Sequence, residues 1–382
     1  MKTIKKILVV SPDYPIEGEP VYPFVKNLCD EFVRKGYNVT VLSPQSLTSR
    51  IRHGKKKRPV ERHDIIGNNK VIIYQPYKIT LPYKFQKINN YLDQICTTNF
   101  LKNHDIIPDV CYGHFWRSGF VLLPFVKKNC LPLFVATGEG ELRKYAPVLT
   151  SSPYLEINKH LNGVISVSSN NRNISRELGL LNGKDCLVAP NAIDSNLYYK
   201  KDSAALRKQY GFNQDDFIVA FVGAFNYRKG SQRVSAAINK VGSVKSFFIG
   251  GQGESELLEP NCEGILFKGR LPHETIPDYL NMADIFVLPT LNEGCCNAIV
   301  EALACGLPIV SSNRPFNFDV LNDSNSIMID PLNVEEIADA IRELKDNKEK
   351  RMRLSNGALK MADDLTIDRR AQKILEFMES HV

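Results

Sequence analysis

The sequence has few of the features that mark membrane or secreted proteins. No apolar stretch approaches the roughly 18 residues that a membrane-spanning helix needs, and the run from Gly119 to Val126 is among the longest. The N-terminus carries lysines, but its apolar run, 7–10, ends at Ser11-Pro12 and is too short for the core of a signal peptide. We therefore expect neither secretion nor a membrane span.

Patterns that bind metals or form redox centres are also missing. The nine cysteines are scattered and include no C-x-x-C pair, so they are expected to be reduced cytosolic thiols. No D-x-D stands between a strand and a turn, and Asp215-Asp216 falls in a polar loop. We expect no metal site and no cofactor.

Length and patterning indicate two α/β domains. The chain has 382 residues, with 43% hydrophobic and 24% charged, which excludes a disulfide module, a coiled coil or general disorder. Short apolar runs alternate with helical patterns, as in parallel sheets covered on both faces. We place one Rossmann-like domain at 1–194 and a second at 195–364, with a terminal helix at 365–382 that packs back on the first.

The strands are expected at the β-branched apolar runs. They are 7–10, 39–42, 71–74, 110–112, 133–136, 164–167 and 187–189 in the first domain, and 218–222, 247–249, 265–267, 285–288, 309–311 and 327–329 in the second. Two doubly wound domains of this kind bind ligands outside the carboxyl ends of their strands.

Positive charge is concentrated in the first half of the chain. The net charge is +7, but residues 1–190 carry 27 Lys and Arg against 15 Asp and Glu. The densest patch, 50–58, is read as an exposed loop that could meet phosphates or an anionic membrane surface. A merely solvated loop is an equal alternative.

Residues 284–310 contain the strongest functional pattern. A strand, a loop with Glu293 and Gly294, a helix capped by Asn297 and ended by Gly306, and a second strand follow one another. Such a helix N-terminus attracts phosphate. Glu301, about one turn inside the helix, would then accept sugar hydroxyls, as acidic residues do for ribose.

Two glutamates eight residues apart are usually solvated surface residues, and that interpretation has to be weighed. The surrounding sequence argues against it, because Glu301 stands in an otherwise apolar, small-residue helix between two buried strands. A charge is costly there without a partner. We therefore interpret Glu293 and Glu301 as a nucleotide-sugar clamp.

The segment resembles the retaining family-four glycosyltransferases of the GT-B fold, whose hallmark is E-x7-E in an E-G-x-x-N-x-x-x-E-A-x-A-C-G-x-P context. The resemblance implies a nucleotide-diphosphate-sugar donor held by the second domain, an acceptor held by the first, and metal-independent transfer with retention. It assigns Glu301 to the ribose and Glu293 to the donor sugar. It also assigns Gly294, Cys295 and Cys296 to a loop whose amides meet the sugar and phosphates.

A second segment, 217–230, has a strand followed by a basic pair. Arg228 and Lys229 would neutralise a departing diphosphate, although surface solvation is the alternative. Within the resemblance Lys229 matches the family's lysine, whereas Ala224 replaces an arginine, so that Arg228 is the substitute. Gly223, at the end of the strand, is expected to lie in the donor-binding site.

The remaining candidates come from loops that the resemblance locates. Arg270 matches the loop around the nucleobase, and Gly18 is what remains of a glycine-rich loop near the donor phosphates. His114 lies in a loop that resembles the family's H-x-H loop, with Tyr112 in place of the first histidine. It could contact the acceptor or the donor, and a structural histidine is the alternative. Gly138 replaces a family histidine near the reacting centre, and Glu139 or Glu141 could orient the acceptor hydroxyl or act as base.

The sequence thus predicts a cytoplasmic hexosyltransferase that uses a UDP- or GDP-sugar. Its acceptor would be a glycan, carried on a lipid at the inner face of the membrane, in cell-surface polysaccharide synthesis. A nucleotide-sugar epimerase of the same fold and a non-catalytic basic binding protein are the alternatives, as is a degenerate transferase that only binds. A nucleic-acid partner is not expected, because no recognisable module is present.

Overall fold

The computed structural model describes residues 4–16, 21–52, 57–252 and 258–382. The chain divides into two compact units: unit 1 comprises Met1–Ala189 and Ile367–Val382, and unit 2 comprises Pro190–Thr366. The sequence places these divisions at 194 and 364, a few residues away. Gly18 lies outside the described residues.

Unit 1 is built on an eight-stranded sheet whose order is β10-β9-β8-β7-β1-β2-β5-β4. Its strands are β1 (Lys6–Val10), β2 (Asn38–Leu42), β4 (Glu61–Ile66), β5 (Asn69–Tyr74), β7 (Val110–His114), β8 (Leu133–Thr137), β9 (Leu161–Ser166) and β10 (Cys186–Val188), and β3 (Gln45–Ser46) pairs with β6 (Tyr77–Lys78) separately. All pairs are parallel except β4 with β5.

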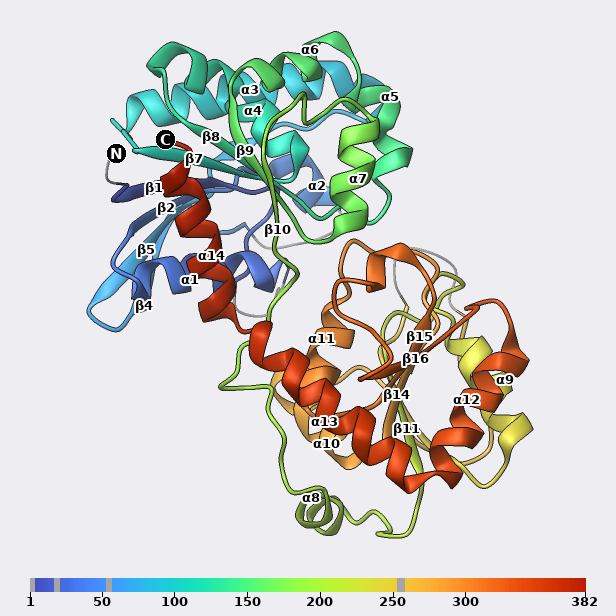
Figure 1. Ribbon diagram of the computed structural model, residues 1–382. Coiled ribbons are helices and arrows are strands. Elements are labelled where there is room, and N and C mark those ends of the chain that lie inside the picture. The colour runs from blue at the N-terminus through green and yellow to red at the C-terminus, as the bar shows by residue number, and fades with distance from the viewer. Residues whose placement is uncertain (1–3, 17–20, 53–56, 253–257) are drawn as a thin grey trace. The chain divides into compact units, whose positions relative to one another are not determined.

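Helices cover both faces of this sheet. They are α1 (Pro23–Arg34), α2 (Leu47–Arg52), α3 (Gln86–Asn103), α4 (Trp116–Asn129), α5 (Ala146–Leu149), α6 (Ser152–Leu155), α7 (Ser169–Glu177) and α14 (Ile367–Ser380), with 3₁₀ turns η1 (Tyr83–Phe85), η2 (Leu142–Tyr145) and η3 (Glu156–Lys159). In Figure 1, α1 and α14 lie on one face, and α3 and α4 on the other. The core is formed by the apolar residues of the central strands, which are almost fully buried.

Unit 2 contains a six-stranded parallel sheet in the order β13-β12-β11-β14-β15-β16. Its strands are β11 (Ile218–Val222), β12 (Lys245–Ile249), β13 (Ile265–Gly269), β14 (Ile285–Leu288), β15 (Ile309–Ser312) and β16 (Ser326–Ile329). Its helices are α8 (Ser203–Tyr210), α9 (Ser231–Val241), α10 (Ile276–Met282), α11 (Asn297–Ala304), α12 (Val334–Asp346) and α13 (Lys348–Asp364), with 3₁₀ turns η4 (His273–Thr275) and η5 (Pro315–Asn317). Figure 1 shows α9 and α12 on one face, and α10, α11 and α13 on the other.

The last helix, α14, returns to unit 1. Asp368 Oδ1 accepts a hydrogen bond of 2.6 Å from Lys35 Nζ, and the ring of Phe377 lies edge-on to Phe134, 5.9 Å between centroids. Gly163 leaves room for this ring, because a Cβ there would stand 2.7 Å from two Phe377 carbons. The C-terminal segment is therefore part of the core of unit 1.

Replacing Ile374, a fully buried residue of α14, tests this assignment. We expect Ile374→Ala to lower the free energy of unfolding by about 2–5 kcal/mol, because it removes buried methyl groups and leaves a cavity. Lys373→Ala, at an exposed neighbouring position, is the matched control and should change it by less than about 0.5 kcal/mol. Equal values for the two variants in urea titrations would show that α14 does not contribute to the core.

Candidate functional site

The sheet of unit 2 reverses its winding between β11 and β14. From β11 the chain proceeds outward to β12 and β13, and from β14 it proceeds the other way to β15 and β16. The loops that leave adjacent strands in opposite directions open a crevice at their carboxyl ends, where ligands of such sheets bind. Glu293 follows β14, and Lys229 follows β11, so both candidates lie at this switch point.

The loop after β11 presents the basic pair. The backbone N–H of Lys229 donates to Asn226 Oδ1 at 2.9 Å, which closes the turn before α9. Gly230 then adopts a left-handed conformation, φ +80°, which most side chains disfavour. The geometry directs the Lys229 and Arg228 side chains toward the neighbouring loop.

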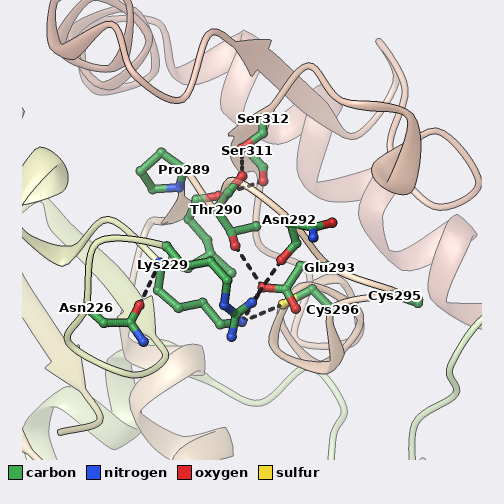
Figure 2. Close-up of polar contacts among 12 residues, drawn as sticks. Asn226, Lys229, Pro289, Thr290, Asn292, Glu293, Cys295, Cys296, Ser311 and Ser312 are labelled. Carbon is green, nitrogen blue, oxygen red and sulfur yellow. Dashed lines mark hydrogen bonds and ion pairs between the residues drawn. The ribbon is translucent and has the colours of Figure 1, made fainter. Parts of the chain in front are cut away.

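Three donors converge on one carboxylate oxygen, Oε1 of Glu293 (Figure 2). Lys229 Nζ lies 2.6 Å from it, Arg228 Nη1 2.7 Å, and Thr290 Oγ1 2.7 Å. Arg228 also donates to the carbonyl of Asn292 at 2.9 Å. The contacts join the loop after β11 to the loop after β14. Among the described residues no hydrogen bond reaches the other oxygen, Oε2.

The charges of Glu293 and Lys229 depend on each other because both side chains are mostly buried. The side chains of Glu293 and Lys229 are each 13% exposed, whereas that of Arg228 is 42% exposed. Burial alone would raise the pKa of Glu293, but the charges of Lys229 and Arg228 outweigh it, and the pKa is lowered. Burial would likewise lower the pKa of Lys229, yet Cys296 and Glu293 raise it. Both groups are therefore charged at neutral pH.

Cys296 adjoins this cluster at the start of α11. Its sulfur lies 3.6 Å from Lys229 Nζ, and burial raises the pKa of its thiol despite Lys229 and the nearby amides of Ala298 and Ile299. The prediction that Asn297 caps the helix is wrong. Cys296 holds the cap position, and Asn297 Oδ1 instead accepts a hydrogen bond of 2.7 Å from Asn191.

Glu301 has its own partners one turn further along α11. Its Oε1 lies 3.8 Å from Nε2 of His273, and the Tyr198 hydroxyl lies 3.1 Å from the same nitrogen. The nearby carboxylate of Glu301 raises the pKa of His273. Burial and the charge of Glu301 raise the pKa of Tyr198. Glu301 is thus a partly buried carboxylate, 16% exposed, with two polar neighbours.

Other candidates of unit 2 have a structural role in the same loops. Gly294 and Cys295 are buried, and the Cys295 carbonyl accepts a hydrogen bond from Asn191 at 3.0 Å. Gly250 packs closely against Gly223. A Cβ atom at position 250 would lie 1.9 Å from the Gly223 carbonyl oxygen. Arg270 is exposed and donates to the Gln252 carbonyl at 2.6 Å. No described contact joins it to Glu293.

In unit 1, His114 is a neutral buried histidine. It ends β7 among aromatic rings, 4.4 Å from Phe115 and 5.4 Å from Phe24 between centroids. Burial, with the charge of Arg370, lowers its pKa to about 3. Neither ring nitrogen has a hydrogen-bond partner among the described residues. The residue is suited to hydrogen bonding without charge, not to proton transfer near neutral pH.

Both carboxylate oxygens of Glu139 accept hydrogen bonds from neighbouring residues of unit 1. Its Oε1 accepts from the Trp116 amide at 3.0 Å, and its Oε2 accepts from Thr137 Oγ1 at 2.7 Å and the Gly138 amide at 3.0 Å. Burial raises its pKa, and these hydrogen bonds oppose the rise. Glu141 is exposed and pairs with Lys144. This geometry favours an anchoring role for Glu139 at the start of α4.

The expected basic loop is only partly at the surface. Arg58 is 3% exposed, forms an ion pair with Asp13 and donates to the Tyr14 carbonyl at 3.0 Å. Arg50 is 7% exposed. Residues 53–56 lie outside the described part of the chain. The prediction that the whole segment is an exposed loop is therefore wrong for Arg50 and Arg58, which are buried, whereas Arg52 and Lys57 are exposed as expected.

Sequence reasoning missed three side chains that the structure brings to these positions. Thr290 lies three residues before Glu293 in the same loop, and this short spacing is a local signal for the contact. Asn191 and Tyr198 come from the segment after β10, far from α11 in the sequence, and no local pattern connects them to it. Only the tertiary fold places them beside Asn297 and His273.

Among the residues that the structure describes, no group of three or more His, Cys, Asp or Glu side chains is arranged to hold a metal ion. No helix in the same described ranges is long and apolar enough to cross a membrane.

Comparison with solved structures defines the class of fold. The structure superimposes on the sucrose-phosphate synthase of Thermosynechococcus elongatus with a TM-score of 0.79 at 16% identity, over 98% of both chains. It also superimposes on Anabaena Alr3699/HepE in complex with UDP-glucose, with a TM-score of 0.70 at 17% identity, over 98% of this chain and 99% of that one. The chain therefore has the GT-B fold of glycosyltransferases.

Comparison with known sequences shows which glycosyltransferases the chain resembles. Residues 202–361, most of unit 2, match the family described as "Glycosyl transferases group 1". Over 349 residues the chain is 24% identical to TuaC of Bacillus subtilis (strain 168), a glycosyltransferase assigned to teichuronic acid biosynthesis, covering 88% of each protein. The family match thus covers most of unit 2, and the likeness in fold covers both units.

The pair formed by Glu301 and His273 is testable by titration. We expect NMR to give His273 a pKa above its usual 6.5 in the wild type, and closer to that value in Glu301→Gln, because the nearby carboxylate favours the imidazolium. The stability that this contact contributes is complete below the unfolded pKa and is lost as the pH rises through the folded pKa. Identical titration curves would contradict the contact.

Glu139 and Glu141 form a matched pair for a stability test. Glu139→Ala should lower the free energy of unfolding by about 1–3 kcal/mol, because it leaves the Trp116 and Gly138 amides and the Thr137 hydroxyl without their acceptor. Glu141→Ala removes an exposed carboxylate and should cost less than about 1 kcal/mol. Urea unfolding measures both, and a smaller loss for Glu139→Ala would contradict the anchoring role.

Proposed function

We propose that the protein is a retaining, metal-independent glycosyltransferase that transfers a hexosyl group from a UDP- or GDP-sugar to a glycan acceptor. The observation that carries the proposal is the cluster of Lys229, Arg228 and Glu293 at the switch point of the unit 2 sheet. The cluster combines two cations with a carboxylate at a helix N-terminus. The match of unit 2 to the group 1 glycosyltransferases supports the same activity.

The two cations suit a nucleoside diphosphate leaving group. When the bond between the sugar C1 and the phosphate oxygen breaks, negative charge develops on the diphosphate, and preorganised cations stabilise it. Lys229 is held by Glu293, so little reorganisation is needed. The more exposed Arg228 and the first amides of α11 are available to the phosphates. Side-chain cations would thus supply the charge that other transferases take from a metal.

The two glutamates suit the sugar parts of the donor. Glu293 uses Oε1 for its protein partners, so Oε2 can accept a hydrogen bond from a hydroxyl of the transferred sugar. Glu301, near Tyr198 and His273, can accept the vicinal hydroxyls of the ribose. Gly294, Cys295, Cys296, Gly223 and Arg270 would line the donor site, as the family resemblance implies. The UDP-glucose complex of HepE supports a nucleotide-sugar donor.

Retention follows from attack on the face of the sugar that the diphosphate leaves. The acceptor hydroxyl would form the new bond to C1, and its proton would pass to the departing phosphate. No dedicated protein base is then required, which accords with the neutral His114 and the hydrogen-bonded Glu139. The similarity to TuaC supports polysaccharide synthesis as the setting, and a lipid-linked glycan is the acceptor that we propose.

Thermal-shift binding tests the donor site first. A panel of UDP-, GDP- and ADP-sugars should contain one nucleotide series that raises the melting temperature of the wild type, since ligands stabilise the state they bind. We expect Glu301→Ala to lose this response, and Glu263→Ala, an exposed acidic position in the same unit, to retain it. No response from the wild type to any nucleotide sugar would contradict the proposal.

Turnover tests the cations. Lys229→Ala should lower kcat by about 10²–10³-fold, the usual cost of removing one group that stabilises developing negative charge. Lys240→Ala, in the exposed last turn of α9, is the control and should leave kcat unchanged. The assay should include a reaction without acceptor, because conversion of the free nucleotide sugar into an isomer would instead identify an epimerase.

A further inference from the structure

Over residues 88–97, helix α3 of unit 1 exposes four apolar side chains and buries four polar ones, whereas its last turn buries Leu101. Ile88, Tyr91, Leu92 and Ile95 are 48%, 63%, 37% and 39% exposed, and they recur at the spacing of one helix face. The opposite face buries polar side chains instead, namely Asn89, Asn90, Asp93 and Thr97. This is the reverse of the pattern that a surface helix of a water-soluble domain normally shows.

Polar contacts fix this orientation. Asn89 exchanges two hydrogen bonds with the backbone of Leu81, at 2.8 and 2.9 Å. Asp93 accepts hydrogen bonds from Lys78 Nζ and Arg117 Nη2, both at 2.7 Å. The helix cannot rotate to bury its apolar side without breaking them. The exposed apolar row is therefore built into the fold.

The row extends beyond the helix. Phe85 in η1 is 39% exposed and Ile79, after β6, is 61% exposed. We refer to Ile79, Phe85, Ile88, Tyr91, Leu92 and Ile95 as the α3 face. Ile51 of α2, 69% exposed, belongs to the neighbouring segment, because Thr48 Oγ1 donates to the Thr80 carbonyl at 2.8 Å. Such a group of exposed apolar side chains marks an interaction surface.

The exposed charges of the segment 79–103 have one sign. Lys84, Lys87 and Lys102 are exposed on η1 and α3, and Lys84 Nζ lies 5.1 Å from the centroid of the Phe85 ring. Asp93 is the one acidic residue between Ile79 and Asn103, and it is buried in its ion pairs. The α3 face therefore combines apolar side chains with the positive charge of these lysines.

We propose that the α3 face docks the protein on an anionic lipid surface, with α3 lying in the plane of the interface. A helix with apolar side chains on one face and lysines at its margin binds this way, because the apolar groups enter the headgroup boundary while the lysines meet acidic lipids. A second copy of this chain fits less well, because apposing two such faces would bring lysines together. The inference goes beyond the proposed function, since docking requires no donor.

Co-sedimentation with lipid vesicles tests the proposal on the full-length chain. Phosphatidylcholine vesicles are compared with vesicles in which about a third of the lipid is phosphatidylglycerol, because the anionic lipid sets the surface potential. We expect the wild type to sediment with the anionic vesicles and to be released by salt. Ile88→Gln/Leu92→Gln/Ile95→Gln should weaken binding at least about tenfold by removing the apolar groups.

One further variant measures the contribution of the lysines, and another is a control outside the α3 face. Lys84→Gln/Lys87→Gln should weaken binding to anionic vesicles by about fivefold for each lysine and leave the weak binding to neutral vesicles unchanged. Ile65→Gln, at a 69% exposed position of β4 outside the α3 face, is the matched control and should bind as the wild type does. Gln is a good helix former, so the triple variant is expected to fold, and circular dichroism checks this.

Equal sedimentation of the folded triple variant and the wild type would overturn the proposal. So would a wild type that binds neither vesicle, or a concentration-dependent dimer in sedimentation velocity that the triple variant no longer forms. These outcomes are independent of the nucleotide-sugar experiments, because no readout involves a donor or turnover.

Discussion

The ion pair between Lys229 and Glu293 joins the two loops that leave β11 and β14 in opposite directions. Each charge is mostly buried, so neither is tolerated without the other. Thr290 and Arg228 bind the same carboxylate oxygen and reduce its freedom further. The contact that keeps the switch point of the sheet together therefore also presents charged groups in fixed positions, which is what stabilisation of a charged transition state requires.

The two units use ionisable residues differently at the carboxyl ends of their strands. In unit 2 the acidic and basic side chains are charged and partly accessible, as in the Glu293 cluster and at Glu301. In unit 1, His114 is kept neutral by burial, and Glu139 is used to hold the start of α4. Unit 2 thus presents charged groups at these strand ends, whereas the corresponding groups of unit 1 are neutral or bound by the fold. The α3 face adds an apolar surface flanked by lysines to unit 1.

The sequence predicted the strands correctly wherever buried apolar residues form a continuous run. All the strands expected from β-branched apolar runs are present, because strands buried on both faces read as continuous apolar segments. The two-domain GT-B arrangement followed from their order and from the resemblance. Strand β4, Glu61–Ile66, was missed because it is an edge strand with alternating charged residues. Exposed edge strands lack the apolar run on which such a prediction depends.

Short-range patterns of apolar and charged residues were enough to predict the fold class, the basic pair and the two glutamates. The partners of these residues depend on the tertiary structure. It placed Tyr198 and Asn191 beside α11, enclosed Arg58, and turned the apolar row of α3 outward. Contacts between residues distant in the sequence fix these arrangements, such as those of Asn191 with Asn297, 106 residues apart, and of Asp93 with Arg117, 24 residues apart. No local periodicity encodes them, since helix amphipathicity shows that a helix has two faces but not which one meets the core.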